Sequence, residues 1–360
     1  MGDVRIAAIP GDGIGAEVLP VAITVIDAAL GVDNEQMSWS WFDWGCDRFH
    51  DEGAMMPADG LETLSEFDAI FLGAVGRPDV PDDVSLWGLL IPIRRAFDQY
   101  VNLRPIRMFD GVSPRVVVPD GATIDLLIVR ENTEGEYSES GGRFMRGTDR
   151  EFAVQNDIFT RIGIERITRY ACERAVARSS HLTSATKSNG IIHTMPFWDE
   201  VVAEVTAEYP SVRVDKRLID ALAAELVLRP SEFDVIVASN LYGDILSDLA
   251  AAIVGSLGIA ASANLNPERR FPSMFEPVHG SAPDISGLGV ANPIAAVWSG
   301  AMMLEHLGRG DAAARMMRAI ERTLADPRTR TRDLGGTAST QGVVDALLIE
   351  IANEVAPTRG

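Results

Sequence analysis

Two aspartates that follow an apolar segment are the first candidates for chemistry in this sequence. Residues 233–238 are nearly all apolar, which is typical of a strand buried on both faces. We expect Asn240 to end this strand and Gly243 to separate it from a helix with apolar residues at intervals of three and four. Asp244 and Asp248 then lie one turn apart on one helical face. Such paired carboxylates suit a hard cation such as Mg²⁺ or Mn²⁺.

The same pair has an explanation that needs no metal. Acidic side chains in the first turn of a helix interact favourably with the positive end of the helix dipole. A metal site would in addition need a cradle for an anionic substrate elsewhere in the chain, because hard ions leave coordination positions to substrate and water. The aspartates alone leave both explanations open.

Three arginines could supply that cradle. Arg104 precedes Pro105 in an extended segment, and Arg130 ends the strand at residues 126–130. Arg94 belongs to a predicted helix near residue 90. Arginines at strand ends and at the start of a helix, in a strongly acidic chain, favour bidentate binding of carboxylates.

The predicted helix around Arg94 also carries an indole. Trp87, Leu90, Ile91 and Arg94 share one face at helical spacing, provided that Pro92 lies in the first turn. This face would border a substrate with an aromatic wall. The alternative is that Trp87 is a core residue that points away from any site.

Composition limits the classes of partner. The formal net charge is −20, which argues against nucleic acid and anionic membranes, because both require a basic surface. Of the 32 cationic residues only Lys187 and Lys216 are lysines. A buried lysine can lose its proton at neutral pH and an arginine cannot, so a retained lysine is a candidate for proton transfer.

The remaining composition predicts a two-domain protein of the cytoplasm. A chain of 360 residues exceeds one ordinary core. Cys46 and Cys172 form no metal or disulfide framework, the N-terminus lacks a signal-like segment, and no apolar run reaches membrane length.

The order of elements is that of an α/β protein. A strand at residues 4–10, the turn GDGIG and a helix open the chain, and strands and helices alternate from residue 158 to the helical tail beyond Asn292. Gly11, Gly13 and Ala16 formally match a Rossmann turn, but Asp12 would repel a pyrophosphate and the required acid further along is missing. Residues 137–154 are glycine-rich and polar, and they predict a projecting hairpin that meets a partner.

Six segments together resemble the metal-dependent β-decarboxylating hydroxyacid dehydrogenases, the family of isopropylmalate, isocitrate, tartrate and D-malate dehydrogenases. The segments span essentially the whole chain: IPGDGIGAEV, LLIPIRRAFDQYVNLRP, IVRENTEGEYS, TSATKSNG, NLYGDILSD and FEPVHGSAPDISGLGVANP. The resemblance implies an open α/β sheet of the isopropylmalate dehydrogenase type without a Rossmann turn. It also implies two domains, with residues 1–99 and 253–360 binding the cofactor and residues 100–252 binding substrate and forming a homodimer.

The resemblance assigns roles to particular residues. The carboxylates of a small dicarboxylate would be held by Arg94, Arg104 and Arg130, and the substrate pocket would be lined by Trp87 and Leu90. Mg²⁺ or Mn²⁺ would be bound by Asp244 and Asp248 together with Asp220 of a second subunit. Protons would be transferred by Tyr137 and by Lys187 of that second subunit. K⁺ is a further candidate ion. The two sites of the homodimer would therefore be shared, and the hairpin would clasp the two subunits.

The cofactor implied by the resemblance is NAD. The residues assigned to it are Glu276, His279, Gly280, Ser281, Ala282, Asp284 and Asn292. A carboxylate at position 284 accepts hydrogen bonds from ribose hydroxyls and would repel the 2′-phosphate of NADP. Outside this context, Asp284 would be explained as a turn cap.

The sequence around Trp87 favours the tartrate and D-malate branch, because an indole there would fill the space that a large substituent at C3 of the substrate would need. We therefore expect oxidation of tartrate or D-malate, with or without decarboxylation. Two alternatives remain: a 3-isopropylmalate dehydrogenase, and a redox-neutral tartrate decarboxylase that uses the same site.

Overall fold

The computed structural model describes residues 4–355, and the chain divides into two compact units. The first unit comprises Met1–Gln99, Met108–Arg115 and Ala251–Gly360, and the second comprises Tyr100–Arg107 and Val116–Ala250. The sequence placed Met108–Arg115 in the middle domain. The segment belongs to the first unit because the Arg115 amide donates to the Ile253 carbonyl at 2.7 Å and the Phe109 ring packs on Trp298.

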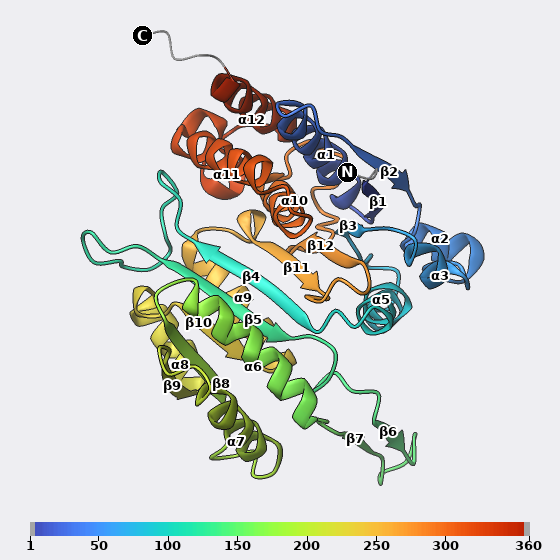
Figure 1. Cartoon of the computed structure of the whole chain (residues 1–360). Helices are drawn as coiled ribbons and strands as arrows, with labels where there is room; N and C mark the ends of the chain where they lie inside the picture. The colour runs from blue at the N-terminus through green and yellow to red at the C-terminus, as the bar shows by residue number, and fades with distance from the viewer. Residues whose placement is uncertain (1–3, 356–360) are drawn as a thin grey trace. The chain divides into compact units, whose positions relative to one another are not determined.

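The first unit is built on five strands in the order β2-β1-β3-β12-β11 (Figure 1). All neighbours are parallel except β11 and β12, which are antiparallel. The strands are β1 (Val4–Gly11), β2 (Met37–Trp41), β3 (Ala69–Ala74), β11 (Ala261–Leu265) and β12 (Ser273–Pro277). The helices are α1 (Gly15–Gly31), α2 (Cys46–Glu52), α3 (Gly60–Leu64), α4 (Asp82–Ser85), α5 (Ile91–Ala96), α10 (Ile294–His306), α11 (Gly310–Ala325) and α12 (Thr340–Val355), with 3₁₀ turns at Leu257–Ile259, Pro327–Thr329 and Arg332–Leu334.

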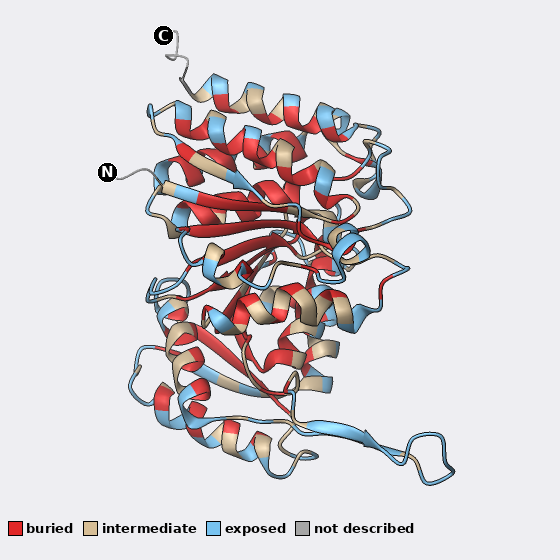
Figure 2. Ribbon diagram, turned by 90° about the vertical axis from the view of Figure 1, so that its right-hand side faces the viewer, coloured by how far each residue is buried: buried red, intermediate tan, exposed pale blue. Residues whose placement is uncertain are grey.

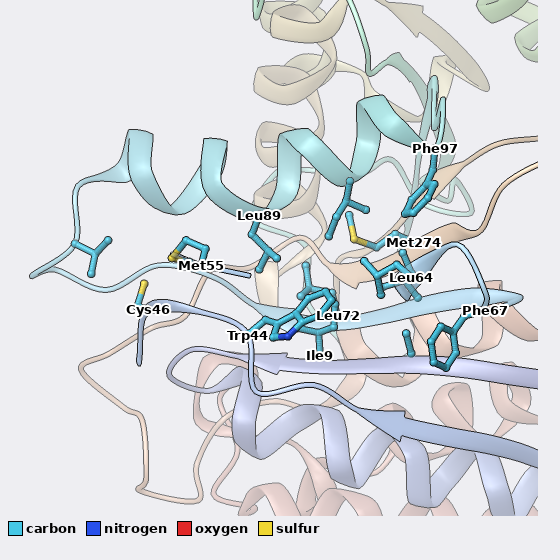
Figure 3. Packing of buried hydrophobic residues seen from close by; sticks show 14 residues of the cluster. Ile9, Trp44, Cys46, Met55, Leu64, Phe67, Leu72, Leu89, Phe97 and Met274 are labelled. Carbon is cyan, nitrogen blue, oxygen red and sulfur yellow. The ribbon is translucent and has the colours of Figure 1, made fainter. Parts of the chain in front are cut away.

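A buried apolar cluster joins this sheet to the helical segment before Gln99 (Figure 3). Leu89 and Phe97 lie on the side of that segment that faces the strand residues Ile9 and Leu72. Trp44 fills the space beside Leu72. Burial of these large side chains is the main stabilising term for this layer, at roughly 1.5–3 kcal/mol per side chain.

The turn between β1 and α1 carries its own anion. Asp12 is buried, and its carboxylate accepts hydrogen bonds from the amides of Cys46 and Gly76, both at 2.8 Å. Gly13 has a φ of +57°, and a Cβ there would lie 2.1 Å from the Ser281 carbonyl oxygen. A carboxylate therefore occupies the turn that a Rossmann fold leaves to pyrophosphate, which agrees with the predicted fold class.

A π-helical turn, Leu86–Leu90, connects α4 to α5. The Ile91 amide donates to the Leu86 carbonyl, five residues earlier, and Pro92 follows in the first turn of α5. Pro92 therefore lies in the first turn of its helix, as the interpretation of this segment required, but Trp87 lies before that helix, in the π turn. The wider turn accommodates a proline, which has no amide to donate and crowds the preceding turn.

The second unit has five strands in the order β4-β5-β10-β8-β9, with β4 antiparallel to β5 and the other neighbours parallel. The strands are β4 (Val101–Arg107), β5 (Asp125–Glu131), β8 (His181–Thr186), β9 (Arg213–Leu218) and β10 (Val235–Ala238). The helices are α6 (Arg161–Val176), α7 (Thr194–Thr206), α8 (Ile219–Leu228) and α9 (Asn240–Val254), whose end from Ala251 onward belongs to the first unit, with a 3₁₀ turn at Pro230–Glu232. The predicted alternation of strands and helices is confirmed here.

The predicted hairpin is present as β6 (Gly141–Phe144) paired with β7 (Phe152–Gln155). Both strands are exposed along their whole length (Figure 2). The Phe144 and Phe152 rings stack on each other with centroids 5.0 Å apart, and both remain about half exposed.

No helix among residues 4–355 is long and apolar enough to cross a bilayer.

Helix α9 begins directly after β10 and runs through Gly243 without a break, contrary to the prediction. A Cβ at Gly243 would lie 2.5 Å from the Arg130 Cβ. The glycine is therefore needed for close contact between the helix and the end of β5.

We predict that Gly243→Ala destabilises the protein by roughly 1–3 kcal/mol, because the added methyl group collides with Arg130. Alanine in an open helical position should instead stabilise by up to about 1 kcal/mol. Gly31, the last residue of α1, has no atom within 4 Å of such a Cβ and is the matched control. Thermal unfolding of both variants tests the contact, and equal melting temperatures would contradict it.

Candidate active site

The carboxylate of Asp244 is the centre of a cluster in the second unit. Arg130 Nη1 donates to Asp244 Oδ1, and Arg104 Nη1 lies 3.2 Å from the same oxygen. The Tyr137 hydroxyl donates to Asp244 Oδ2 at 2.9 Å. Three of the residues that the sequence singled out therefore meet on one carboxylate, which remains 33% exposed.

Asp248 lies one helical turn beyond Asp244, as predicted. Arg104 Nη1 donates to Asp248 Oδ1 at 3.2 Å and to Ser247 Oγ at 2.5 Å. Desolvation raises the pKa of Asp248, and the negative charge of Asp244 raises it further. The Asp248 side chain is nevertheless 58% exposed, so a cation that approached from solvent could reach it.

The structure weakens the explanation based on the helix dipole. Because α9 begins at Asn240, its first turn contains no acidic residue, and Asp244 and Asp248 follow in later turns. The dipole acts mainly within the first turn. The two carboxylates and their mutual repulsion instead fit a divalent cation that prefers oxygen ligands.

Arg130 is held by a residue that the sequence indicated only as the end of a strand. Its side chain is 2% exposed, and Nε and Nη2 donate to the Asn240 side-chain oxygen at 3.1 and 2.7 Å. The Asn240 amide nitrogen donates in turn to the Glu134 carbonyl at 3.0 Å. An asparagine at the start of a helix that follows a strand was the only signal for this role.

Glu136 fixes the segment that carries Tyr137. Its carboxylate accepts from Ser239 Oγ at 2.6 Å and from the Leu241 amide at 3.1 Å, where α9 begins. A carboxylate at this position also interacts favourably with the positive end of the dipole of α9. Desolvation raises the pKa of Tyr137, and Asp244 raises it further, so the phenol keeps its proton at neutral pH.

Lys187 and Asp220 contact each other within the chain. Lys187 Nζ donates to Asp220 Oδ1 at 2.5 Å, and this bond is the main reason that the pKa of Asp220 is lowered. Within residues 4–355 no group of three or more His, Cys, Asp or Glu side chains could hold a metal ion. The contribution of Lys187 and Asp220 to the site of a second subunit stays a prediction.

Arg94 lies in the first unit and pairs with another predicted site residue. Its Nη2 donates to Glu276 Oε1 at 2.7 Å, and the Asn264 amide nitrogen donates to the same oxygen at 2.7 Å. The Nε atoms of Arg94 and of Arg104 are buried and have no hydrogen-bond partner within the described part of the chain. Each is an N–H donor that an anionic ligand could satisfy.

The π-helical turn changes the face on which Trp87 lies. Helical spacing predicted Trp87 on the face of Arg94, but the guanidinium stacked on its ring is that of Arg95, 4.9 Å from the ring centroid. The π turn inserts one residue into the helical phase between Trp87 and α5. Leu90, the last residue of that turn, remains partly exposed.

The predicted cofactor residues lie in the first unit along β12 and the loop that follows it. His279 Nδ1 contacts the Gly280 carbonyl at 3.0 Å, and Nε2 is buried and lacks a partner among residues 4–355. Desolvation lowers the pKa of His279, so the imidazole is neutral at pH 7. A neutral imidazole with an unused nitrogen fits a nucleotide base or ribose.

The rest of the loop has a defined backbone. The Ser281 carbonyl accepts from the Ile14 amide at 2.8 Å, and Ala282 has a φ of +39°. The Asn292 amide nitrogen donates to Asp333 Oδ2 at 3.0 Å. Asp284 is exposed, as recognition of a ribose by its carboxylate would require.

Glu131 is a buried acid that the sequence did not indicate. Its carboxylate accepts from the amides of Thr133 and Glu134 and from the Thr133 hydroxyl. Desolvation is the largest effect and raises its pKa from 4.5 to about 7.

We predict that this group makes the protein less stable as the pH rises from about 4.5 to about 7, because the folded chain retains a proton that the unfolded chain releases. The loss is at most about 3 kcal/mol. Glu131→Gln mimics the protonated acid and should flatten this part of the stability curve, measured by urea unfolding at about pH 5 and about pH 8. Parallel curves for the variant and the wild type would contradict the prediction.

The chain is similar to known proteins over nearly its whole length. The family model for isocitrate/isopropylmalate dehydrogenase matches residues 5–347. The D-malate dehydrogenase [decarboxylating] of Escherichia coli (strain K12) is 54% identical over 359 residues, covering 96% of this chain and 98% of that protein. The tartrate dehydrogenase/decarboxylase of Pseudomonas putida is 54% identical over 352 residues, covering 95% and 96%.

A solved structure shows the same fold. The isocitrate dehydrogenase from Methylococcus capsulatus aligns with a TM-score of 0.88 at 35% identity, covering 97% of this chain and 99% of that one. The predicted open α/β fold of the isopropylmalate dehydrogenase type is confirmed. The chain is a member of the isocitrate/isopropylmalate dehydrogenase family.

Proposed function

We propose that this enzyme oxidises D-malate or tartrate with NAD⁺ and a divalent metal ion, and that the oxidation is coupled to decarboxylation. The observation that carries the proposal is the convergence of Arg104, Arg130 and Tyr137 on Asp244. Two relatives that are 54% identical, a D-malate dehydrogenase and a tartrate dehydrogenase/decarboxylase, support the substrate class.

A dicarboxylate matches the cations of the site. Arg104 and Arg130 already bind one carboxylate, that of Asp244, and Arg104 keeps a buried Nε–H without an acceptor in the described chain. Arg94 has the same unused donor. Guanidinium groups bind carboxylates through paired N–H donors, so these arginines would fix the orientation of a diacid.

Asp244 and Asp248 would hold Mg²⁺ or Mn²⁺, with Asp220 contributed by a second copy of the chain. When bound, such an ion lowers the pKa of a hydroxyl group and stabilises negative charge on oxygen. The residues fit the ion because they supply carboxylate oxygens at adjacent turns of a rigid helix.

Proton transfer falls to Lys187 and Tyr137. Lys187, as an amine, would accept the proton from the 2-hydroxyl group of a substrate in the partner subunit, with Asp220 holding it in place. Tyr137 would donate its proton to the carbon from which CO₂ departs. A phenol whose pKa is raised, and which is held by Asp244, keeps this proton until it is needed.

The first unit would hold NAD⁺, which when bound supplies a hydride acceptor for the oxidation of a 2-hydroxy acid. Glu276, His279 and Asn292 would contact the cofactor in the first unit, with the unused His279 nitrogen as the structural support. Asp284 would select NAD over NADP by repulsion of the 2′-phosphate.

Trp87 would exclude substrates with a bulky group at C3. The support for this role is the sequence around Trp87, because the π turn and the contact with Arg95 place the indole off the helical face of Arg94. D-malate and tartrate carry hydrogen or hydroxyl at C3, whereas 3-isopropylmalate carries a branched alkyl group and should be poor.

A homodimer with shared sites is part of the proposal. The exposed hairpin offers apolar side chains, Phe144, Met145, Phe152 and Val154, that a second copy of the chain would cover.

Redox-neutral decarboxylation is a second candidate, because relatives carry the double name tartrate dehydrogenase/decarboxylase. In this path the hydride would return to the product and no NADH would accumulate.

We predict equal molar yields of NADH and CO₂ from D-malate. We also predict that kcat/KM for D-malate or a tartrate isomer is about tenfold or more above kcat/KM for 3-isopropylmalate or isocitrate. Absorbance of NADH and release of CO₂ should be followed together with Mn²⁺ present. CO₂ without NADH would favour the decarboxylase, and a preference for 3-isopropylmalate would overturn the substrate proposal.

Treatment with EDTA is the control for the metal. Turnover should disappear with EDTA and return with Mn²⁺ or Mg²⁺. Full activity in EDTA would contradict the role of Asp244 and Asp248.

A further inference from the structure

The loop at residues 281–292 carries Asp284 and is exposed over much of its length. Short turns organise it internally, with the Ile285 amide donating to the Ala282 carbonyl at 3.1 Å and the Leu288 amide donating to the Ile285 carbonyl at 3.3 Å. Leu288 itself is 64% exposed. Bonds within a loop cannot by themselves fix its position on the domain.

Two contacts fix the ends of this loop to the first unit. The Ser281 carbonyl accepts from the Ile14 amide, and the Gly289 carbonyl accepts from the Thr340 amide at 2.9 Å. The Thr340 hydroxyl also donates to the Ala291 carbonyl at 2.7 Å. The exposed stretch from Pro283 to Leu288 lies between these anchors.

Glu17 binds Gly287 within that stretch and Gly289 directly after it. This residue lies in the first turn of α1, and its two carboxylate oxygens accept from the amides of Gly287 and Gly289, the latter at 3.2 Å. Both glycines have positive φ, +77° and +65°, a conformation in which glycine carries no steric cost. The amides of Gly287 and Gly289 thus share one anionic acceptor, and this acceptor is a side chain of the protein.

We propose that Glu17 is a positioning residue for the cofactor: its carboxylate holds the 281–292 loop in the shape in which Asp284 meets the ribose. The link to the cofactor rests on the proposed use of NAD. Hydrogen bonds to a charged acceptor are about twice as strong as neutral ones, so one side chain can order a short loop.

The proposal explains two features that otherwise have no common cause. Glu17 is an acid at the start of α1 whose side-chain hydrogen bonds within residues 4–355 go only to this loop, and the turn SGLG places two glycines at the positions that donate to it. Without Glu17, the loop would sample other shapes, and NADH would bind only the competent fraction. If that fraction fell to about one-tenth, the apparent Kd would rise about tenfold.

The first test needs no ligand. Hydrogen exchange of the amides at residues 284–290 should be about tenfold faster in Glu17→Ala than in the wild type, and less accelerated in Glu17→Gln, which keeps one acceptor oxygen. Asp311→Asn is the matched control, because Asp311 lies in the first turn of α11 in the same unit, and it should leave the exchange unchanged. Unchanged exchange in both Glu17 variants would overturn the proposal.

The second test is a fluorescence titration with NADH alone. The Kd should rise about tenfold in Glu17→Ala and less in Glu17→Gln, with the control at the wild-type value. Faster exchange with an unchanged Kd would overturn the link between the loop and the cofactor. Failure of the wild type to bind NADH would overturn the proposed cofactor, and the exchange result would still decide whether Glu17 holds the loop.

Discussion

Arg130 carries a permanent positive charge at the end of β5, where only 2% of its side chain reaches solvent. A buried guanidinium is stable only with a carboxylate and with acceptors for its other N–H groups, and loss of such a partner typically costs about 3–5 kcal/mol. Asp244 provides the charge and Asn240 accepts the remaining bonds. Much of the second unit follows from the need to bring these groups together.

Three contacts bring Arg130, Asn240 and Asp244 together, and the first is the register of the sheet. Arg130 pairs with Ala238 across the parallel strands β5 and β10, so the end of one strand lies beside the start of α9. Gly243 supplies the second, because only a residue without a Cβ lets the helix lie against the Arg130 side chain. Glu136 supplies the third, by attaching the Tyr137 segment to the first turn of the same helix. Together these contacts place a phenol, the Arg130 guanidinium group and two carboxylates at the carboxyl ends of the parallel strands β5 and β10, where open α/β sheets commonly bind ligands, and Arg104 joins them from the antiparallel strand β4.

The sequence predicted those parts of this arrangement that are encoded locally. Helical periodicity placed Asp244 and Asp248 one turn apart, and the apolar run before them was a buried strand. It did not predict the continuous helix through Gly243, because the reason for that glycine is a contact with Arg130, which is more than a hundred residues away. Nor could periodicity reveal the π turn, which shifted the helical phase and paired Trp87 with Arg95.

The sequence failed to indicate several polar residues for the same reason, which is that their roles depend on distant contacts. Glu17, Glu131 and Glu136 are ordinary acids in sequence, and their functions appear only when the amides they bind are brought to them by the fold. The structural role of a glycine or a proline is likewise ambiguous in the sequence, because it depends on the residues that contact it in the fold. Residue type and spacing therefore predict which groups carry charge in the site, while tertiary contacts decide which of them hold the others in place.

We propose that Asp244 and Asp248 of one chain bind the divalent metal ion together with Asp220 of a second chain. Calorimetric titration of Mn²⁺ into the wild type, Asp244→Asn and Asp248→Asn tests it most directly. We expect each amide to weaken binding by about tenfold or more, because an amide oxygen lacks the charge that a hard cation selects. Unchanged affinity in both variants would contradict the account and leave the two aspartates as partners of arginines alone.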